Sequence, residues 1–309
     1  MPPQEHDPRR SLETAVLETV LYSDLFDYPL TRQELSHYLI GARADAELIA
    51  ACLDAPRYLN GHVRQIGEYI VARRRERLVE TRRARQATSF RLWTRARRYA
   101  RILAALPYVR MVAITGSLAM DNSGPAGDID LMIVTTRGRV WLARAEAIAL
   151  HYAARLVRDA LCPNYFVSED ALALEARDIY AAHEFAQMVP LFWLAVHQRM
   201  RQANEWVYAH LPNARTPLRA EAEIRIGRLA RAAKRIGEWL LGGRLGDALE
   251  RWEMQRKQRK FAPQITAASS AMLDRDHMKG HFVDYGPPIR RRFAEQLAEF
   301  MVDEGPRAA

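Results

Sequence analysis

The sequence contains very little cysteine and very little lysine. Cys52 and Cys162 are the only thiols among 309 residues, which excludes a disulfide framework as the basis of the fold. Only four of the 46 basic residues are lysines, so the net charge of +9 rests on arginine. A bias toward arginine and alanine is also typical of GC-rich genomes. The basic charge is therefore a weak indication of nucleic-acid binding.

Long hydrophobic runs are also missing. The longest unbroken apolar run, from Val189 to Val196, is too short to span a bilayer, and the first ten residues lack the apolar stretch of a signal peptide. We therefore expect a cytoplasmic protein with no membrane partner. A hydrophobic content of 49% in a chain of this length is enough for two or three folded units.

Two short apolar runs carry the most informative polar residues. The run from Val109 to Ile114 leads into Thr-Gly-Ser, and the run from Asp128 to Val134 begins Asp-Ile-Asp. Side chains alternate along a strand, so Asp128 and Asp130 should share one face and suit a divalent cation such as Mg²⁺. A glycine lets the backbone approach a phosphate closely, and a serine can donate to it. The pattern predicts a metal-dependent phosphoryl-transfer site.

This arrangement resembles the signature of the nucleotidyltransferase superfamily that includes DNA polymerase β. The resemblance covers about residues 109–168. It implies that Gly116 and Ser117 bind the triphosphate of an NTP, with ATP favoured, and that Asp128 and Asp130 coordinate the catalytic Mg²⁺ or Mn²⁺. From the residues alone, another interpretation is that Asp128 caps the strand and Asp130 pairs with an arginine.

The third carboxylate of the family pattern has no clear counterpart. Asn164, in a strand expected from Cys162 to Ser168, aligns with it and could ligate a metal through its carbonyl oxygen. Glu169 and Asp170 are alternative third acids. An asparagine cannot act as an anionic base, so both an active enzyme and a binding-only core stay open.

The N-terminal part resembles a winged helix-turn-helix domain over about residues 11–73. Its third expected helix, around Asp45 to Leu53, is acidic and apolar, which suits a phosphate backbone poorly. Nucleic acid is therefore a possible partner but not the favoured one. The expected elements are helices at Ser11 to Phe26, from Thr31 with a Thr31/Glu34 capping box, and at Asp45 to Leu53, and strands at Tyr58 to Gln65 and Glu68 to Ala72.

Most of the remaining chain has helical patterns. His183 and Glu184 lie inside one of them, and a structural role is favoured there over a metal role. The expected helices are Arg73 to Leu106, Val140 to Leu161, Asp178 to Leu211 with a break at Pro190, Leu218 to Trp252 with a turn at Gly242-Gly243, and Ile289 to Val302.

The segment from His277 to Gly286 precedes the last of these helices. We expect it to be a surface loop, or to fold back over the site so that Lys279 reaches a phosphate. His277 and His281 have the spacing of a helical metal pair, but Gly280 opposes a helix.

Together these patterns predict an α+β fold. A mixed-sheet nucleotidyltransferase core at 107–175 would follow a winged-helix-like domain at 1–73 and a connector helix at 74–106, with a helical domain at 176–309. The expected activity is transfer of a nucleoside monophosphate from an NTP to an unidentified hydroxyl of a small molecule, RNA or protein. The alternatives are a DNA-binding or protein-binding regulator with a degenerate nucleotide-sensing core, and antitoxin-like modification of a partner protein. The candidate residues are Asp128 and Asp130 for catalysis, Gly116, Ser117 and Lys279 for nucleotide binding, and Asp128, Asp130 and Asn164 for the metal.

Overall fold

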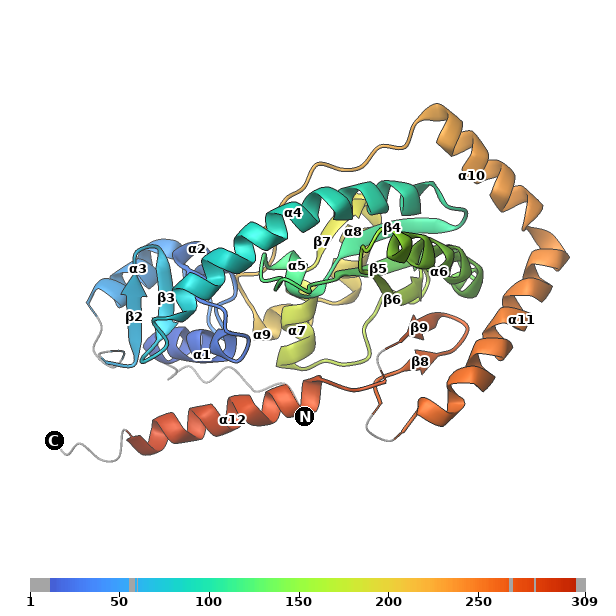
Figure 1. Cartoon of the computed structure of the whole chain (residues 1–309). Helices are drawn as coiled ribbons and strands as arrows, with labels where there is room; N and C mark the ends of the chain where they lie inside the picture. Colours follow the sequence, from blue (N-terminus) through green and yellow to red (C-terminus); the bar gives the residue numbers. More distant parts are fainter. Residues whose placement is uncertain (1–11, 56–58, 60, 267–268, 281, 304–309) are drawn as a thin grey trace.

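The computed structural model describes residues 12–55, 59, 61–266, 269–280 and 282–303. These residues form a mixture of helices and two sheets, one of three strands and one of six. The long helix α4 (Leu78–Ala105) runs from the small sheet to the large one (Figure 1). Among the described residues, no helix combines the length and the apolar character that a transmembrane span needs.

The N-terminal unit contains the three helices and the hairpin that the sequence predicts, although Tyr58 lies outside the described residues. Thr31 and Glu34 form the predicted capping box at the start of the second helix. The antiparallel sheet has the order β1-β3-β2. The elements are α1 (Leu12–Asp24), β1 (Leu30–Thr31), α2 (Arg32–His37), α3 (Ala46–Asp54), β2 (Val63–Ile66) and β3 (Tyr69–Ala72).

The large sheet has the order β7-β4-β5-β6-β9-β8. Its central pair, β5 and β6, is parallel because helix α6 (Val140–Leu156) carries the chain back between them, and every other pair is antiparallel. The strands are β4 (Val109–Ile114), β5 (Ile129–Thr135), β6 (Leu161–Ser168), β7 (Val189–Phe192), β8 (Met272–Leu273) and β9 (His277–Lys279).

Alternation along β5 divides the core into two layers. Ile129, Leu131 and Ile133 face the layer that α4 and α6 cover, and Met132 and Val134 face the opposite layer. Asp130 lies two residues before Met132 on the strand, so its side chain is on the same, second face. That layer is completed by α7 (Ile179–Ala186), α8 (Leu194–Ala203) and α9 (Val207–His210), while the short α5 (Gly116–Ala119) follows β4.

Two strands occupy segments for which the sequence predicts something else. Val189–Phe192 was expected inside a helix, but it is β7, an edge strand that pairs only with β4. Pro190 has no N–H to donate, which an edge strand tolerates. His277–Lys279, expected as a loop, is β9, and it buries Met278 between β6 and β8.

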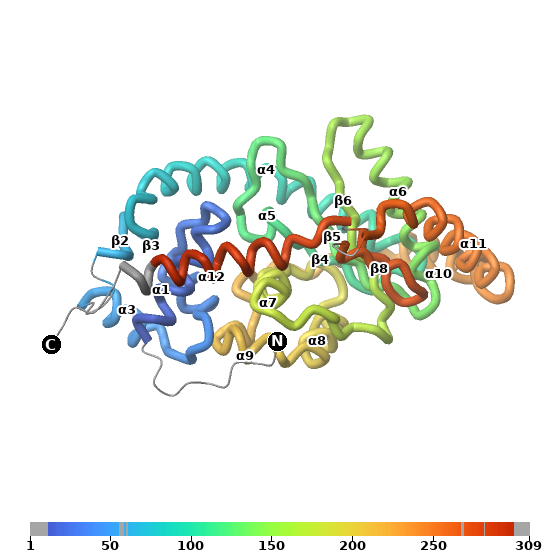
Figure 2. Tube along the Cα trace, turned by 90° about the horizontal axis from the view of Figure 1, so that it is seen from below, coloured from blue at the N-terminus to red at the C-terminus, as the bar shows by residue number. Residues whose placement is uncertain are grey.

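The C-terminal helices wrap around the outside of the molecule. Helices α10 (Arg228–Leu240) and α11 (Gly243–Phe261) form an outer arm, residues 228–261, with the predicted turn at Gly242 (Figure 1). The first of them starts at Arg228, ten residues later than expected. A 3₁₀ turn (Ala262–Gln264) follows, and α12 (Gly286–Asp303) runs back past α7 and α1, as Figure 2 shows. His281 lies outside the described residues.

Candidate functional site

The two aspartates lie where β5 begins, beside the neighbouring strand β6. Ile129 pairs with Leu161 and Asp130 with Cys162, so Asp130 and Cys162 stand next to each other. Ligand atoms of Asp128, Asp130 and Cys162 all lie within 4.8 Å of one another. The structure therefore brings the two predicted aspartates together, and it adds a thiol that sequence reasoning did not select.

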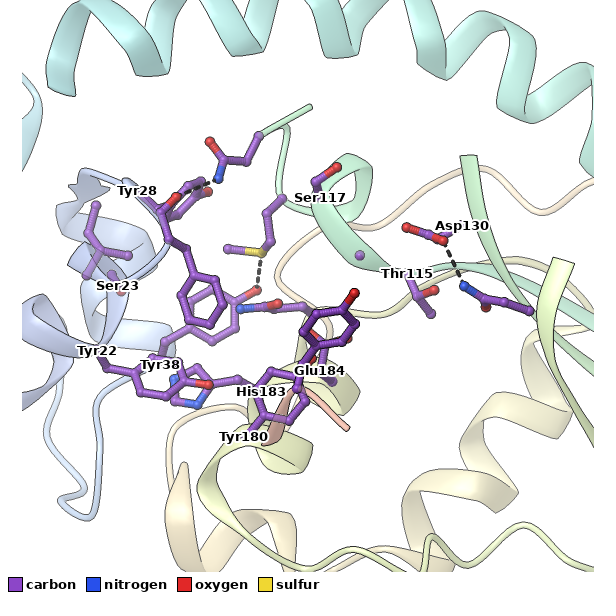
Figure 3. A pocket seen from close by; sticks show the side chains of 18 residues that line it. Tyr22, Ser23, Tyr28, Tyr38, Thr115, Ser117, Asp130, Tyr180, His183 and Glu184 are labelled. Carbon is purple, nitrogen blue, oxygen red and sulfur yellow. Dashed lines mark hydrogen bonds between the residues drawn. The ribbon is translucent and has the colours of Figure 1, made fainter. Parts of the chain in front are cut away.

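A β-bulge in β6 places Asn164 at the same point. Leu131 pairs with Pro163 and Met132 with Tyr165, which leaves Asn164 as the extra residue. Its side-chain amide Nδ2 donates to Asp130 Oδ1 at 2.8 Å, the contact drawn beside Asp130 in Figure 3. In this contact Asn164 orients a carboxylate with its N–H group, whereas the sequence analysis expected its carbonyl oxygen to act.

The Gly-Ser turn packs directly against Asp130. Gly116 has φ +64°, and a Cβ atom there would lie 2.5 Å from Asp130 Oδ2. Any other residue would be strained and would collide with the carboxylate. The backbone N–H of Thr115 donates to the Asp130 carbonyl oxygen at 3.1 Å, and the exposed Ser117 follows Gly116 at the cavity edge. Gly116, which the sequence predicts as a site residue, must therefore be a glycine because Asp130 lies so close to it.

The site is strongly electronegative. Burial, then the charge of Asp128 and then that of Glu184, raise the pKa of Asp130 to about 7, against hydrogen bonds from Cys162 and Asn164 that lower it. Burial and the same two aspartates raise the pKa of the Cys162 thiol to about 12. The thiol is therefore protonated at neutral pH, and the carboxylates repel each other unless a cation joins them.

Within the described residues, neither Asp128 nor Asp130 forms an ion pair with lysine or arginine. Other acids nearby do, as in the pairs Glu34–Arg82, Asp121–Arg219 and Asp159–Arg95. The interpretation that an arginine neutralises Asp130 is therefore wrong for this part of the chain.

Glu169 and Asp170 are not the third acid. They follow the opposite end of β6, about 20 Å along the strand from Cys162. Arg199 lies 3.9 Å from Glu169 and Arg137 lies 3.4 Å from Asp170. Each carboxylate has a cationic partner and lies far along β6 from the site.

Glu184 supplies a third carboxylate from a different element. It lies on α7 and lines the same cavity as Asp130 (Figure 3). Burial raises the pKa of Glu184 to about 6, and the charge of Lys279 opposes that rise. The sequence alone does not indicate that Glu184 reaches this cavity, because its proximity to Asp130 depends on how α7 packs against the sheet.

A cavity of about 300 Å³ lies between the N-terminal unit and the large sheet (Figure 3). One side is polar and carries Gly116, Ser117, Asp130 and Asn164, whereas Glu184 lies on α7 beside Tyr180. The other side is aromatic, with residues from the N-terminal unit and α7: Tyr22, Phe26, Tyr28, Tyr38 and Tyr180. A planar ring would fit beside such groups more favourably than a flexible polar chain.

His183 belongs to the aromatic wall. Its ring stacks on Tyr22 with 3.9 Å between centroids, and Nδ1 lies 2.9 Å from the carbonyl oxygen of Ile179. Burial lowers the pKa of His183 to about 3, so the ring is neutral at physiological pH. These contacts give His183 the structural role that the sequence analysis favoured.

Two further cavities adjoin the acids. One cavity, of about 470 Å³, shares Asn164 and Glu184 with the first and is also lined by Lys279. Strand β9 thus brings this lysine to the site, which agrees with the expectation that its segment folds back over the site. The other, of about 360 Å³, reaches Asp128 and Cys162 and is lined by Arg155 and Arg158. The acids can thus be approached through an aromatic cavity and through a basic one.

No protein-family model, curated protein or solved structure matches the chain. What the site can do therefore follows from its own residues. Their chemistry is that of converging, partly buried carboxylates beside a glycine turn and three cavities.

Proposed function

We propose that the protein is a divalent-metal-dependent nucleotidyltransferase that moves a nucleoside monophosphate from an NTP to a hydroxyl acceptor. The observation that carries the proposal is the convergence of Asp128 and Asp130, without a cationic partner in the described residues, against Gly116 of the Gly-Ser turn. A carboxylate that is desolvated beside a second acid favours a bound cation, which makes a purely structural role for Asp130 costly.

The donor set fits a hard cation. Asp128 and Asp130 offer carboxylate oxygens, which Mg²⁺ and Mn²⁺ prefer, and the protonated Cys162 thiol is a poor ligand for either. These two aspartates would hold the ion, with Asn164 fixing the orientation of Asp130. When bound, the ion would stabilise negative charge on the transferring phosphoryl group.

The neighbouring residues provide the other roles of such a reaction. Gly116 lets the backbone approach the phosphates, while the Ser117 hydroxyl and the Lys279 ammonium group would bind their oxygens. Glu184, ionised above a pKa of about 6, would accept the proton of the acceptor hydroxyl. The acceptor oxygen would bond to the α-phosphorus as the bond to the β-phosphate oxygen breaks, releasing pyrophosphate.

The cavities suggest how two substrates reach the acids. An in-line displacement needs the attacking and leaving oxygens on opposite sides of the phosphorus. The tyrosine-lined cavity suits the base of an NTP, with ATP the first candidate, whose phosphates would lie at Gly116. The acceptor would enter through the adjoining cavity of about 470 Å³, which Glu184 also lines, so that its hydroxyl can reach this carboxylate.

The N-terminal unit, which resembles a winged helix-turn-helix domain, would then serve as a wall of the site. Tyr22, Tyr28 and Tyr38 from this unit line the cavity. The exposed side of α3 carries Glu47 and Leu48, which a phosphate backbone does not attract. A regulator that reads DNA through α3 is therefore the less supported alternative.

Calorimetric titration of each NTP, with and without Mg²⁺, tests the proposal. We expect one NTP to bind only with Mg²⁺, Asp130→Asn to lose that binding, and the matched control Asp170→Asn, at the far end of β6, to keep it. NTP binding that does not depend on Mg²⁺, or that is retained in Asp130→Asn, would overturn the assignment.

A further inference from the structure

The outer arm carries its apolar side chains on the side that faces away from the body. The exposed fractions are 80% for Trp239 and 58% for Leu240 at the end of α10, and 65% for Leu245 at the start of α11. Leu229 and Ile236 extend this apolar face along α10, and Trp252 lies further along α11. An amphipathic helix normally turns its apolar side to the core, so this orientation is reversed.

Polar groups of α10 bind the body instead. The buried Lys234 ammonium group donates to the carbonyl oxygens of Ala104 and Val109 at 2.9 and 2.6 Å. Glu238 accepts from the backbone N–H of Tyr108 and from Arg110, at 2.9 and 2.7 Å. These contacts fix which side of α10 faces inward, so its apolar side cannot turn to the core without breaking them.

Helix α11 uses its acids in the same way. Glu250 accepts from the backbone N–H groups of Trp141 and Leu142, both at 2.8 Å, and so caps the first turn of α6. Asp247 pairs with Arg139 at 2.7 Å. Glu253 is also buried, but it pairs within α11, with Arg256 at 2.7 Å.

The outward side of the arm is therefore apolar and basic. All four acids within residues 228–261 take part in the contacts described above, whereas Arg244 and Arg251 are exposed on α11 and Arg235 is exposed at the edge of the groove that α10 forms with the body. The turn between α10 and α11 lies at the outermost point of the arm in Figure 1 and at the same end of the molecule in Figure 2. Trp239, Leu240 and Leu245 surround this turn.

We propose that this corner of the arm binds the interface of an anionic lipid bilayer. Tryptophan and leucine flanked by arginine, on helices of low net hydrophobicity, are the composition of segments that lie within a membrane interface without spanning it. Trp239, Leu240 and Leu245 enter the headgroup region, and Arg235 and Arg244 bind lipid phosphates. A second copy of the chain is disfavoured as the occupant, because two such faces would bring their arginines together.

Sedimentation with lipid vesicles tests this inference, independently of the chemistry proposed for the acids. The full chain should bind vesicles of equal parts phosphatidylcholine and phosphatidylglycerol, bind pure phosphatidylcholine far less, and dissociate as salt is added. Trp239→Gln with Leu240→Gln should abolish binding. Arg235→Gln and Arg244→Gln should each weaken it about fivefold.

A matched control removes equally exposed apolar groups elsewhere. Tyr152→Gln with Leu156→Gln changes two exposed side chains of α6, and this variant should bind the anionic vesicles like wild type. The circular dichroism of all variants should be unchanged, since the altered side chains point into solvent.

Three results would overturn the inference. The first is no binding to anionic vesicles, and the second is equal binding by the Trp239/Leu240 variant. The third is that the same variant instead loses binding to single-stranded RNA or duplex DNA, or loses a dimer seen by light scattering, which would assign the corner to nucleic acid or to a second copy.

Discussion

The two ends of the parallel pair β5–β6 both carry acids, but among the described residues only the acids at one end have cationic partners. Where β5 begins, Asp128 and Asp130 converge with no cationic side chain paired to them in the described residues. Just past the end of β6, Glu169 and Asp170 each have an arginine within 4 Å. In a chain with this much arginine, a carboxylate without an arginine partner is the informative one. The comparison marks the first pair as a site and the second as surface.

The largest effect is expected from a substitution at the unpaired end, where β5 begins. Asp130→Asn removes the proposed metal ligand and should lower the rate of the proposed nucleotide transfer by about a thousandfold. Asp170→Asn, which alters the paired end, should leave the rate within twofold of wild type, roughly the scatter of surface substitutions. The measurement is release of pyrophosphate with the NTP that binds. Equal losses in the two variants would erase the distinction between the ends.

The next effect concerns an acid that is paired and half-buried. Arg82 donates to Glu34 at 2.8 Å and to the Met120 carbonyl oxygen at 2.8 Å, and it lies over the ring of Tyr28. Arg82→Met should lower the free energy of unfolding by about 2 kcal/mol, because Glu34 and the Met120 carbonyl oxygen each lose a hydrogen bond from a charged group. Urea unfolding gives this value.

Binding of Mg²⁺ by the folded Arg82→Met variant should match wild type, because Arg82 contacts Glu34, Met120 and Tyr28 and not the two aspartates. A folded Arg82→Met variant that no longer binds Mg²⁺ would contradict this distinction between paired and unpaired acids.

Glu184 sharpens the comparison, because it is also unpaired in the described residues but comes from α7. Glu184→Gln should reduce transfer by about a hundredfold if this carboxylate accepts the proton of the acceptor. It should also remove the acidic limb of the pH–rate profile near pH 6, which follows from a pKa of about 6. Unchanged KM for the NTP separates this role from nucleotide binding. A variant with lower activity but the same acidic limb would assign Glu184 a structural role.

A smaller effect concerns stability of the metal-free protein. The pKa of Asp130 rises from 3.8 to about 7 on folding, so the folded state binds this proton more tightly than the unfolded state. The free energy of unfolding should therefore fall as pH rises from about 4 through 7.

Asp130→Asn should remove this slope and be more stable than wild type at pH 8 in EDTA. Urea unfolding at pH 5 and pH 8 measures both quantities. If the free energy of unfolding changes equally with pH in wild type and in the variant, ionisation of Asp130 does not destabilise the folded protein.

Local patterns were sufficient to predict much of the central sheet and the position of the two aspartates. The run Val109–Ile114 is a strand with the predicted ends, and Asp130 lies on the predicted face, because apolar alternation and a following turn are local signals. Gly116 was also selected correctly as a special position, although the reason for it, the approach of Asp130, became visible only in the fold.

The features that sequence reasoning missed depend on distant partners. Val189–Phe192 is apolar enough for a buried helix and becomes a strand only because β4 offers a free edge. Cys162 and Glu184 reach the aspartates through strand register and helix packing, for which a single sequence has no signal. The outward orientation of the apolar side of α10 has no local signal either, because Glu238 and Lys234 set it by binding residues far away in the chain.

The most direct test of the central claim is a titration of the wild-type protein with Mn²⁺ at pH 8, followed by electron paramagnetic resonance of the free ion. The account predicts a site that holds Mn²⁺ in wild type and in Asp170→Asn, and that is lost in Asp130→Asn. It also predicts weaker binding below pH 7, as protons compete for Asp130. No Mn²⁺ bound, or equal binding by Asp130→Asn, would contradict the account.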